Sequence, residues 1–220
     1  MSSPVPHPWQ PLRDRLEAFW AERAPEADGA HDLHHLRRVW RNARAIAATE
    51  PGVDLAVLVA AAYLHDLVNP PKDDPERSAA SRLSAAQAEP ILAGMGLEPE
   101  RAAAAAHAIE AHSFSAGIEP RTLEARILQD ADRLEALGAI GLARCFYTGG
   151  KLGSALWAPE DPLGLTGRTL DDRRYAVDHF PAKLLRLQDG MRTAEGWRLA
   201  EARTRLLRAF LEQLALELGE

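Results

Sequence analysis

Apolar and polar residues recur along most of this chain with the period of an amphipathic α-helix. Stripes at positions i, i+3, i+4 and i+7 put the apolar side chains of each segment on one face, which predicts helices. Residues 55–64 (LAVLVAAAYL) differ, because none of these side chains is charged, so a helix there should be buried on all sides. The expected helices cover 11–23, 32–49, 55–64, 78–93, 98–112, 122–146, 171–187 and 193–218.

Proline and glycine mark the ends of the early helices. Pro25 follows the first helix, and Pro51-Gly52 follows the second. Proline lacks a backbone donor and disfavours helical geometry in the residue before it, so it ends a helix. Three prolines within residues 69–75 (NPPKDDP) therefore predict a non-helical loop directly after the apolar run.

The second half of the chain is less regular. Gly138 and Gly141 should interrupt the long helix 122–146. Residues 148–170 carry glycine and proline repeatedly, which predicts a long excursion without helix, and an excursion of that length is usually functional or mobile. Neither a repeat nor a linker is evident, so the fold class expected is an all-α, single-domain helical bundle over 1–220.

Composition supports this fold and limits the partners. Apolar residues make up 46% of the chain and aromatic residues only 6%, with many alanines and leucines, which favours helix over sheet. The net charge of −6 argues against a nucleic-acid polymer or a membrane surface as partner, since both would repel it. A local basic pocket for a phosphorylated small molecule is compatible with that charge. Nothing in the sequence indicates an oligomer.

Cysteine content and hydropathy suggest the compartment. Cys145 is the only cysteine, so no disulfide can form within the chain, and a reducing environment is expected. The first ten residues (MSSPVPHPWQ) contain no apolar stretch of the kind found in signal peptides, and no apolar run approaches the length of a membrane span. We therefore expect a cytoplasmic protein.

The apolar run ends abruptly at His65-Asp66. An ionised carboxylate at the end of a buried helix needs a compensating partner, and a metal cation is one candidate. The alternative is a helix that has reached the surface, with both side chains in water. The dipeptide alone does not decide between them, because a second one, His31-Asp32, occurs earlier in the chain.

The helix 32–49 offers further metal-type ligands. With successive residues 100° apart, His35 lies within about 20° of Ile46 at the edge of the apolar stripe. His34 lies on the opposite side, and His31 between the two. His35 is therefore the histidine expected to face inward, although a histidine at the border of an apolar face is often only structural.

Two aspartates occur in the interior of the helix 122–146. Asp competes with the helix backbone for hydrogen bonds, so Asp130 and Asp132 are poor choices on propensity alone. Projection puts Asp130 on the stripe of Leu134 and Asp132 on the opposite side. Geometry alone mildly favours Asp130 as the residue that faces the core, but either could reach a metal if this helix is buried on both sides.

Together these residues resemble a known pattern. His35-x-x-Arg38, then His65-Asp66, then Asp132 within ADRL resembles the H…HD…D motif of the HD superfamily of metal-dependent phosphohydrolases. The segments AAYLHDLVNPPKD, AIEAHSFSA, QDADRLEALGAIGLARCF and DDRRYAVDHFPAKLLRL resemble the YedJ-like subgroup of small bacterial HD-domain proteins. The resemblance covers roughly residues 28–215. It implies an HD-type core over about 28–150, with C-terminal helices in 171–218 packing on it.

The resemblance also implies a ligand set. The family's metal ligands fall on His35, His65, Asp66 and Asp132, so the motif favours Asp132 where projection favours Asp130. Two imidazoles and two carboxylates suit a divalent ion such as Mn²⁺, with Fe²⁺, Co²⁺, Mg²⁺ or Ni²⁺ as alternatives, and do not suit a sulfur-rich structural zinc site.

The implied activity is hydrolysis of a nucleotide. A pyrophosphohydrolase acting on (deoxy)nucleoside triphosphates is the main expectation. A nucleoside monophosphate phosphatase and a non-catalytic metal or nucleotide sensor are the alternatives. We expect catalytic roles for Lys72, Asp73 and His112 and substrate contacts from Arg38, Asn69, Lys72 and Arg133, although most surface cations serve solubility.

One position departs from the family, and one further class stays open. Several HD hydrolases carry an acidic residue three positions after the doublet, where this chain has Asn69, which cannot act as an acid or base. Either Asp73 or Asp74 substitutes from the loop, or a metal-bound hydroxide acts alone, and hydrolysis of an alarmone is less expected for this chain. An HD-type di-iron oxygenase would need extra ligands such as His107 and His112, but their spacing does not place both on one helical face.

Overall fold

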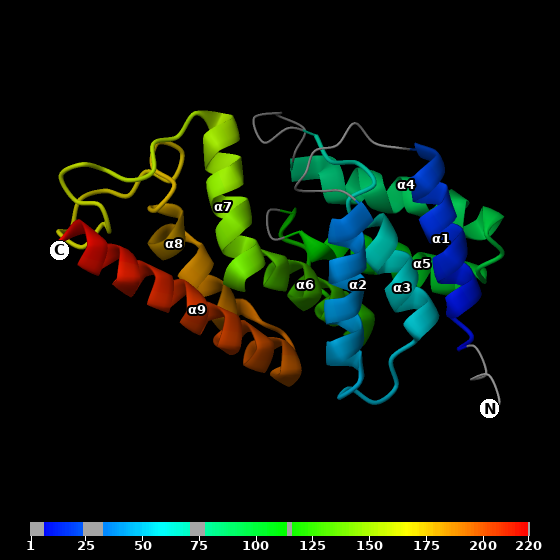
Figure 1. Cartoon of the computed structure of the whole chain (residues 1–220). Coiled ribbons are helices and arrows are strands. Elements are labelled where there is room, and N and C mark those ends of the chain that lie inside the picture. The colour runs from blue at the N-terminus through cyan, green and yellow to red at the C-terminus, as the bar shows by residue number, and fades with distance from the viewer. Residues whose placement is uncertain (1–6, 24–32, 71–77, 114–115, 220) are drawn as a thin grey trace, which may run out of the picture. The chain divides into compact units, whose positions relative to one another are not determined.

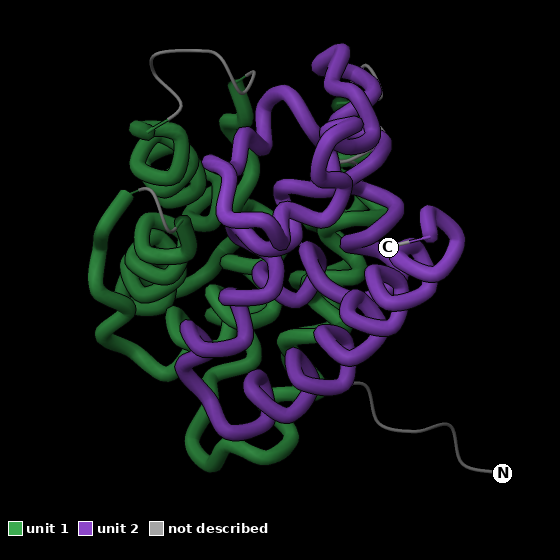
Figure 2. The backbone as a smooth tube through the Cα atoms, turned by 90° about the vertical axis from the view of Figure 1, so that its left-hand side faces the viewer, with its two compact units in different colours: residues 1–132 green, residues 133–220 purple. Residues whose placement is uncertain are grey.

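The computed structural model describes residues 7–23, 33–70, 78–113 and 116–219. These residues are helical with no strand, so the all-α prediction is confirmed. The chain forms two compact units, Met1–Asp132 and Arg133–Glu220, which Figure 2 shows in green and purple. The single-domain organisation over 1–220, with the C-terminal helices packed on an HD core, stays a prediction.

The first unit is organised around the apolar run. Its helix α3 packs against α1, α2, α4 and α5 (Figure 1), and every residue from Val57 to Leu64 is buried, as the sequence predicts. The helices of this unit are α1 (Gln10–Arg23), α2 (Leu33–Ala47), α3 (Leu55–Leu64), α4 (Ala80–Gly94), α5 (Pro99–His112) and α6 (Leu123–Arg133).

Asp54 fixes the start of α3. Its carboxylate Oδ1 accepts hydrogen bonds from the backbone N–H of Ala56 at 2.9 Å and of Val57 at 3.4 Å, which satisfies donors that the first turn of a helix leaves unpaired. Its Oδ2 pairs with Nε of Arg101 on α5 at 2.7 Å. The beginning of α3 is thus tied to α5, and its other end carries the His65-Asp66 doublet.

The predicted interruption of the long helix occurs at Gly138 within the second unit, but not at Gly141, which lies inside the helix α7. Leu137 is extended and Gly138 has φ of 66°, so the chain leaves one helix and enters the next there. Phe146, Phe180 and Phe210 pack together with ring centroids 5.7–6.1 Å apart. The elements are the 3-10 helix η3 (Leu134–Ala136), α7 (Gly138–Leu152), α8 (His179–Ala182), the 3-10 helix η4 (Leu184–Gly190) and α9 (Ala194–Leu218).

Two predicted segments are wrong in this unit. Helix α7 continues to Leu152, so the excursion expected from residue 148 begins only at Gly153. The helix expected over 171–187 does not form. The reason is that its backbone bonds elsewhere: Ala176 N–H donates to Ala155 C=O at 2.9 Å, and Val177 N–H donates to Leu156 C=O at 2.9 Å. Only α8 and η4 remain helical there.

A buried ion pair orders the excursion. Both terminal nitrogens of Arg168 donate to the carboxylate of Asp178, each at 2.6 Å, and Asp178 is fully buried. Burial alone would raise the pKa of Asp178, but the paired hydrogen bonds from Arg168 outweigh it and hold that pKa below its usual range. Arg168 also donates to the carbonyl of Asp161 at 2.9 Å. The Gly- and Pro-rich segment is therefore built around a paired charge.

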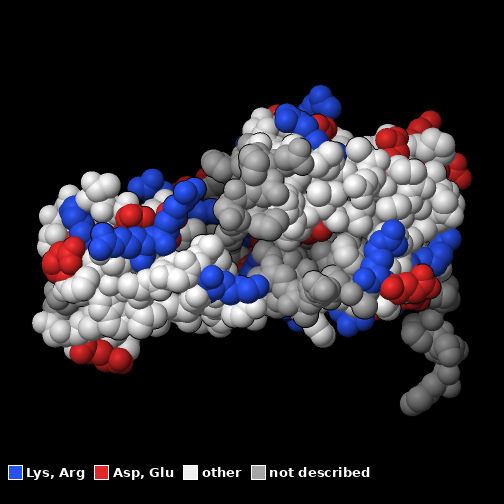
Figure 3. All heavy atoms as spheres, turned by 90° about the horizontal axis from the view of Figure 1, so that it is seen from above, with Lys and Arg blue, Asp and Glu red and all other residues white. Residues whose placement is uncertain are grey.

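The surface and hydropathy add two observations. On the face shown in Figure 3, basic and acidic side chains are interspersed, so that face is not uniformly acidic despite the net charge of −6. In the part of the chain that the structure describes, no helix has both the length and the apolar character to cross a membrane. The cytoplasmic location stays a prediction.

Candidate metal centre

Four side chains from three helices meet at one point of the first unit. Nε2 of His35 on α2 lies 3.3 Å from Nε2 of His65, at the end of α3. Oδ2 of Asp66 lies 3.7 Å from the His35 nitrogen and 3.5 Å from the His65 nitrogen. Oδ1 of Asp132 on α6 lies 3.6 Å and 3.7 Å from the same two atoms. We call these four residues the cluster.

The end of α3 sets the orientation of the His65 ring. A helix leaves its last carbonyls without partners, and Nδ1–H of His65 donates to one of them, the carbonyl of Ala62, at 3.0 Å. This bond assigns the ring proton to Nδ1 and turns Nε2 toward the cluster. His112, the last residue of α5, repeats the arrangement, because its Nδ1–H donates to the carbonyl of Ile109 at 2.6 Å.

The separations fit a bound divalent ion. Bonds of about 2.1 Å to N and O ligands put neighbouring ligand atoms about 3.0 Å apart at an octahedral ion and about 3.4 Å apart at a tetrahedral one. The two nitrogens are 3.3 Å apart, and each lies 3.5–3.7 Å from one oxygen of Asp66 and of Asp132, so a small contraction would bring these atoms to coordination distance. Asp132 forms a group of potential ligands with His35 and His65, and Asp66 forms one with His65 and His112. The donor set has two nitrogens and two carboxylate oxygens, which suits Mn²⁺, Fe²⁺, Co²⁺ or Mg²⁺.

Burial and charge act against each other at this site. His35 and His65 are each 1% exposed, whereas the side chains of Asp66 and Asp132 are 22% and 32% exposed. Burial alone would lower the pKa of His65, but the negative charges of Asp66 and Asp132 raise it to about 9. Burial would raise the pKa of both carboxyls, yet His65 holds them below their usual range. The carboxylates therefore provide a site for positive charge.

The structure shows which of the alternative histidines and aspartates lie at the cluster. His35 is buried and His34 is exposed, as helical projection predicts. Asp132 contributes its carboxylate to the cluster, while Asp130 is fully buried, as its apolar stripe predicts, and belongs to neither group of potential ligands among the described residues. Projection therefore identified the more buried aspartate, and the motif identified the aspartate beside the histidines.

His112 lies next to the cluster. Its ring centroid is 4.9 Å from that of His65, and its Nε2 lies 3.8 Å from Oδ1 of Asp66. Burial, and then the charge of His65, lower its pKa. His112 forms a second group of potential ligands with His65 and Asp66. His107, the other extra ligand that a di-iron site would need, is in neither group, and its Nε2 accepts from the backbone N–H of Arg121 at 3.1 Å.

The residues expected to contact substrate do not converge on one point as the four cluster residues do. Arg38 is half-buried on α2, three residues after His35, and Asn69 is exposed after the doublet. Arg133 donates to the backbone carbonyl of Gly190, in the second unit. The other expectations, at Lys72 and Asp73, lie outside the described residues, as do Asp74 and His31.

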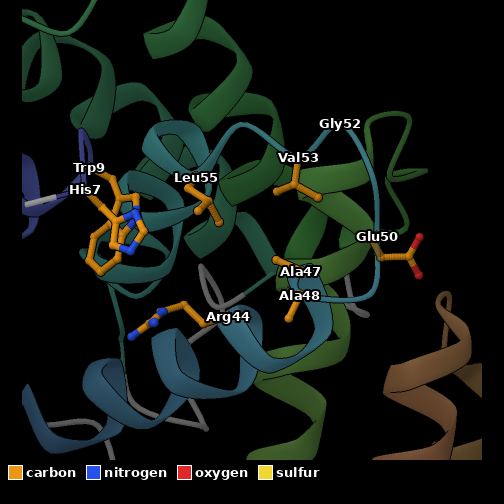
Figure 4. Close-up of a pocket in the computed structure, with 9 residues that line it drawn as sticks. All are labelled: His7, Trp9, Arg44, Ala47, Ala48, Glu50, Gly52, Val53 and Leu55. Carbon is orange, nitrogen blue, oxygen red and sulfur yellow. The ribbon is translucent and has the colours of Figure 1, made fainter. Parts of the chain in front are cut away.

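A separate cavity lies near the N-terminal end of the described chain. It has a volume of about 260 Å³, and its lining includes none of the cluster residues (Figure 4). Trp9 stacks on His7 and packs edge-on against Trp40, and the guanidinium of Arg44 lies 5.0 Å from the Trp9 ring centroid. The cluster, with its convergent ligand atoms, is therefore the candidate site for chemistry.

Comparisons with known proteins give consistent results. The HD domain family model matches residues 32–137, which include all four cluster residues. Protein YpgQ of Bacillus subtilis is 34% identical over 193 residues, which cover 86% of this chain and 85% of that protein. Its crystal structure in complex with ADP has a TM-score of 0.70 at 30% identity, covering 94% of this chain and 93% of that one. An HD-superfamily hydrolase from Bacillus thuringiensis has a TM-score of 0.73 at 28% identity, covering 96% and 98%.

Proposed function

Because this chain belongs to the HD domain family and is a metal-dependent phosphohydrolase, we propose that it hydrolyses a phosphoanhydride bond of (deoxy)nucleoside triphosphates. The observation that carries this proposal is that Asp66 and Asp132 each place a carboxylate oxygen 3.5–3.7 Å from Nε2 of both His35 and His65, which lie 3.3 Å apart, with the carboxylates on the accessible side. A buried structural ion pair would not need two imidazoles and two carboxylates around one point.

The metal proposed is Mn²⁺, held by the four cluster residues. Fe²⁺, Co²⁺, Mg²⁺ and Ni²⁺ have compatible ligand preferences. A divalent ion bound there supplies Lewis acidity toward a phosphoryl oxygen and lowers the pKa of water. The protein's own part is to orient the ligands, and for His65 the Nδ1–H bond to the carbonyl of Ala62 turns Nε2 toward the cluster.

Nearby residues have proposed roles in binding and proton transfer. His112 is buried beside Asp66 and has a lowered pKa, so it is neutral near pH 7 and could accept a proton there. Lys72 and Asp73, which follow the doublet in the sequence, are proposed to bind phosphate and to transfer a proton. Arg38, Asn69 and Arg133 are proposed substrate contacts.

The nucleotide class is supported by a relative. YpgQ has been crystallised in complex with ADP, and the identity of 34% extends over most of both chains. A nucleoside phosphate is therefore the substrate class that we propose for this chain as well. We also propose that the chain is a member of the YedJ-like subgroup and that it is cytoplasmic.

The test is a matrix of metals and nucleotides. Metal-depleted protein is incubated with each divalent ion and with nucleoside mono-, di- and triphosphates, and orthophosphate is separated from pyrophosphate. We expect Mn²⁺-dependent turnover of triphosphates, and in water labelled with ¹⁸O the label should appear in the nucleoside monophosphate if the α-phosphorus is attacked. Lys72→Ala should raise KM for the triphosphate and leave metal content unchanged.

Other outcomes would assign a different function. Release of orthophosphate from monophosphates alone would indicate the nucleotidase. Absence of turnover of every phosphate ester with every divalent ion would refute the hydrolytic proposal and leave a metal or nucleotide sensor.

A further inference from the structure

A carboxylate outside the HD domain match contacts both helices that carry the histidines of the cluster. Glu17 lies on α1, and the family model begins at residue 32. Its Oε2 accepts a hydrogen bond from a terminal nitrogen of Arg37 at 2.8 Å, and its Oε1 accepts one from the hydroxyl of Tyr63 at 2.6 Å. We call Glu17, Arg37 and Tyr63 the Glu17 triad.

The two partners of Glu17 are close to the cluster in sequence. Arg37 comes two residues after His35 on α2, and Tyr63 comes two residues before His65 on α3. One side chain of α1 therefore connects the helix of one histidine with the end of the helix that carries the other.

A second contact from α1 stabilises the same helix end. The indole Nε1–H of Trp20 donates to the backbone carbonyl of Tyr63 at 2.8 Å. That carbonyl is in the last turn of α3, where the helix itself offers no donor. The neighbouring carbonyl of Ala62 accepts from His65, so α1 and the ligand histidine satisfy adjacent groups at this end.

Burial makes the tyrosine contact specific. Tyr63 is 1% exposed and is the only residue with a polar side chain in the run 55–64. A buried hydroxyl without a partner costs about 1–3 kcal/mol, so the hydroxyl favours the position of α1 that brings Glu17 to it. The Glu17 side chain is 30% exposed, and its carboxylate accepts charge-assisted bonds from Arg37.

From these contacts we propose that Glu17 is a positioning residue for the metal centre. By holding Arg37 and Tyr63, it fixes the separation of α2 and the end of α3, and so keeps the His35 and His65 nitrogens at 3.3 Å. Glu17 touches neither metal nor substrate and acts through these two partners. This inference rests on the proposed metal centre at the cluster.

The test measures metal affinity rather than turnover. Mn²⁺ dissociation constants are determined by calorimetry for the full chain and for Glu17→Gln, and Co²⁺ binding is followed by visible absorption, which reports ligand geometry. Replacing a residue that orients metal ligands typically weakens binding tenfold or more, so we expect Glu17→Gln to raise the Kd about tenfold and to change the Co²⁺ spectrum.

A matched control is available in the second unit. Glu195 also accepts two bonds from one arginine, Arg198, at 2.6 and 2.7 Å, and its side chain is 16% exposed. Glu195→Gln removes the same kind of ion pair without involving a cluster helix. It should leave the Mn²⁺ Kd and the Co²⁺ spectrum unchanged, and its effect on thermal stability shows the cost of losing a comparable ion pair away from the cluster.

Tyr63→Phe tests the other contact with less disturbance. It removes one hydroxyl and should weaken Mn²⁺ binding, and combining it with Glu17→Gln should add little, because both act through one carboxylate. Wild-type Mn²⁺ affinity and an unchanged Co²⁺ spectrum in folded Glu17→Gln would overturn the positioning role while leaving the metal centre intact. If the wild-type chain itself binds no divalent ion, the metal centre is refuted and the positioning role with it.

Discussion

Metal binding should release a proton even at pH 8. The pKa of His65 is raised to about 9 by Asp66 and Asp132, so without metal its imidazole is charged at neutral pH. A metal ion takes the place of that proton, because only the neutral ring coordinates. At pH 8 a group with a pKa of about 9 carries about 0.9 proton, whereas one with the ordinary pKa near 6.5 carries about 0.03. Proton release at pH 8 therefore reports the carboxylate environment of His65.

Isothermal titration in two buffers of different ionisation enthalpy measures this number. Mn²⁺ added to metal-depleted protein at pH 8 should release close to one proton per ion bound. Release near zero would show that the carboxylates do not hold a proton on His65, and would contradict the electrostatics argued for the cluster. Stoichiometric binding must be verified in the same titrations.

The raised pKa of His65 also determines how the stability of the metal-depleted protein changes with pH. The pKa of His65 is higher in the folded protein than in the unfolded one, so its contribution to stability is fully present below pH 6.5 and is lost as pH rises toward 9. The metal-depleted protein should therefore melt at lower temperature over that interval. Saturating Mn²⁺ should oppose the loss, because its affinity rises over the same pH range.

Two pairs of substitutions test the ligand assignment. Asp132→Asn should abolish metal-dependent turnover and metal content. Asp130→Asn should keep the metal and lower the free energy of unfolding by about 1–3 kcal/mol, as expected for a buried polar group. Metal analysis and thermal melts would show the reverse pattern if the ligand is Asp130, the residue that projection favours, and not Asp132, the residue that the motif favours. His35→Ala should lose the metal and the exposed His34→Ala should retain it, and equal metal loss in both would refute the choice of His35.

The first unit was predictable because local signals and packing agree there. Residues 55–64 carry no charged side chain, and a helix of that composition is stable only when it is buried. His35 was predicted to face inward from a single helical projection, since α2 has one buried and one solvated face. On α6 the same projection favoured Asp130, which is buried, over Asp132 beside the histidines, because Gln129, Asp130 and Ala131 are all buried in succession and burial there does not identify a ligand.

The second unit was less predictable because its backbone pairs over long distances. The segment around Tyr175 has the composition of a helix, but its backbone bonds to Ala155 and Leu156, and a projection along one segment cannot detect such partners. The pairing of Arg168 with Asp178 was missed for the same reason. The only part of the Glu17 triad that the sequence indicates is the Tyr63 hydroxyl inside an apolar run. A buried hydroxyl requires a hydrogen-bond partner, but the sequence does not identify that partner.

The geometry of the cluster thus has a local and a long-range cause. His65 and His112 each follow the last carbonyls of a helix, and each donates Nδ1–H to the carbonyl three residues earlier, which orients Nε2 without help from distant residues. The separation between His65 and His35 depends instead on how α2 and α3 pack, and Glu17 contacts both helices. Changes at the helix ends should therefore alter ligand orientation, while changes in the Glu17 triad should alter ligand spacing.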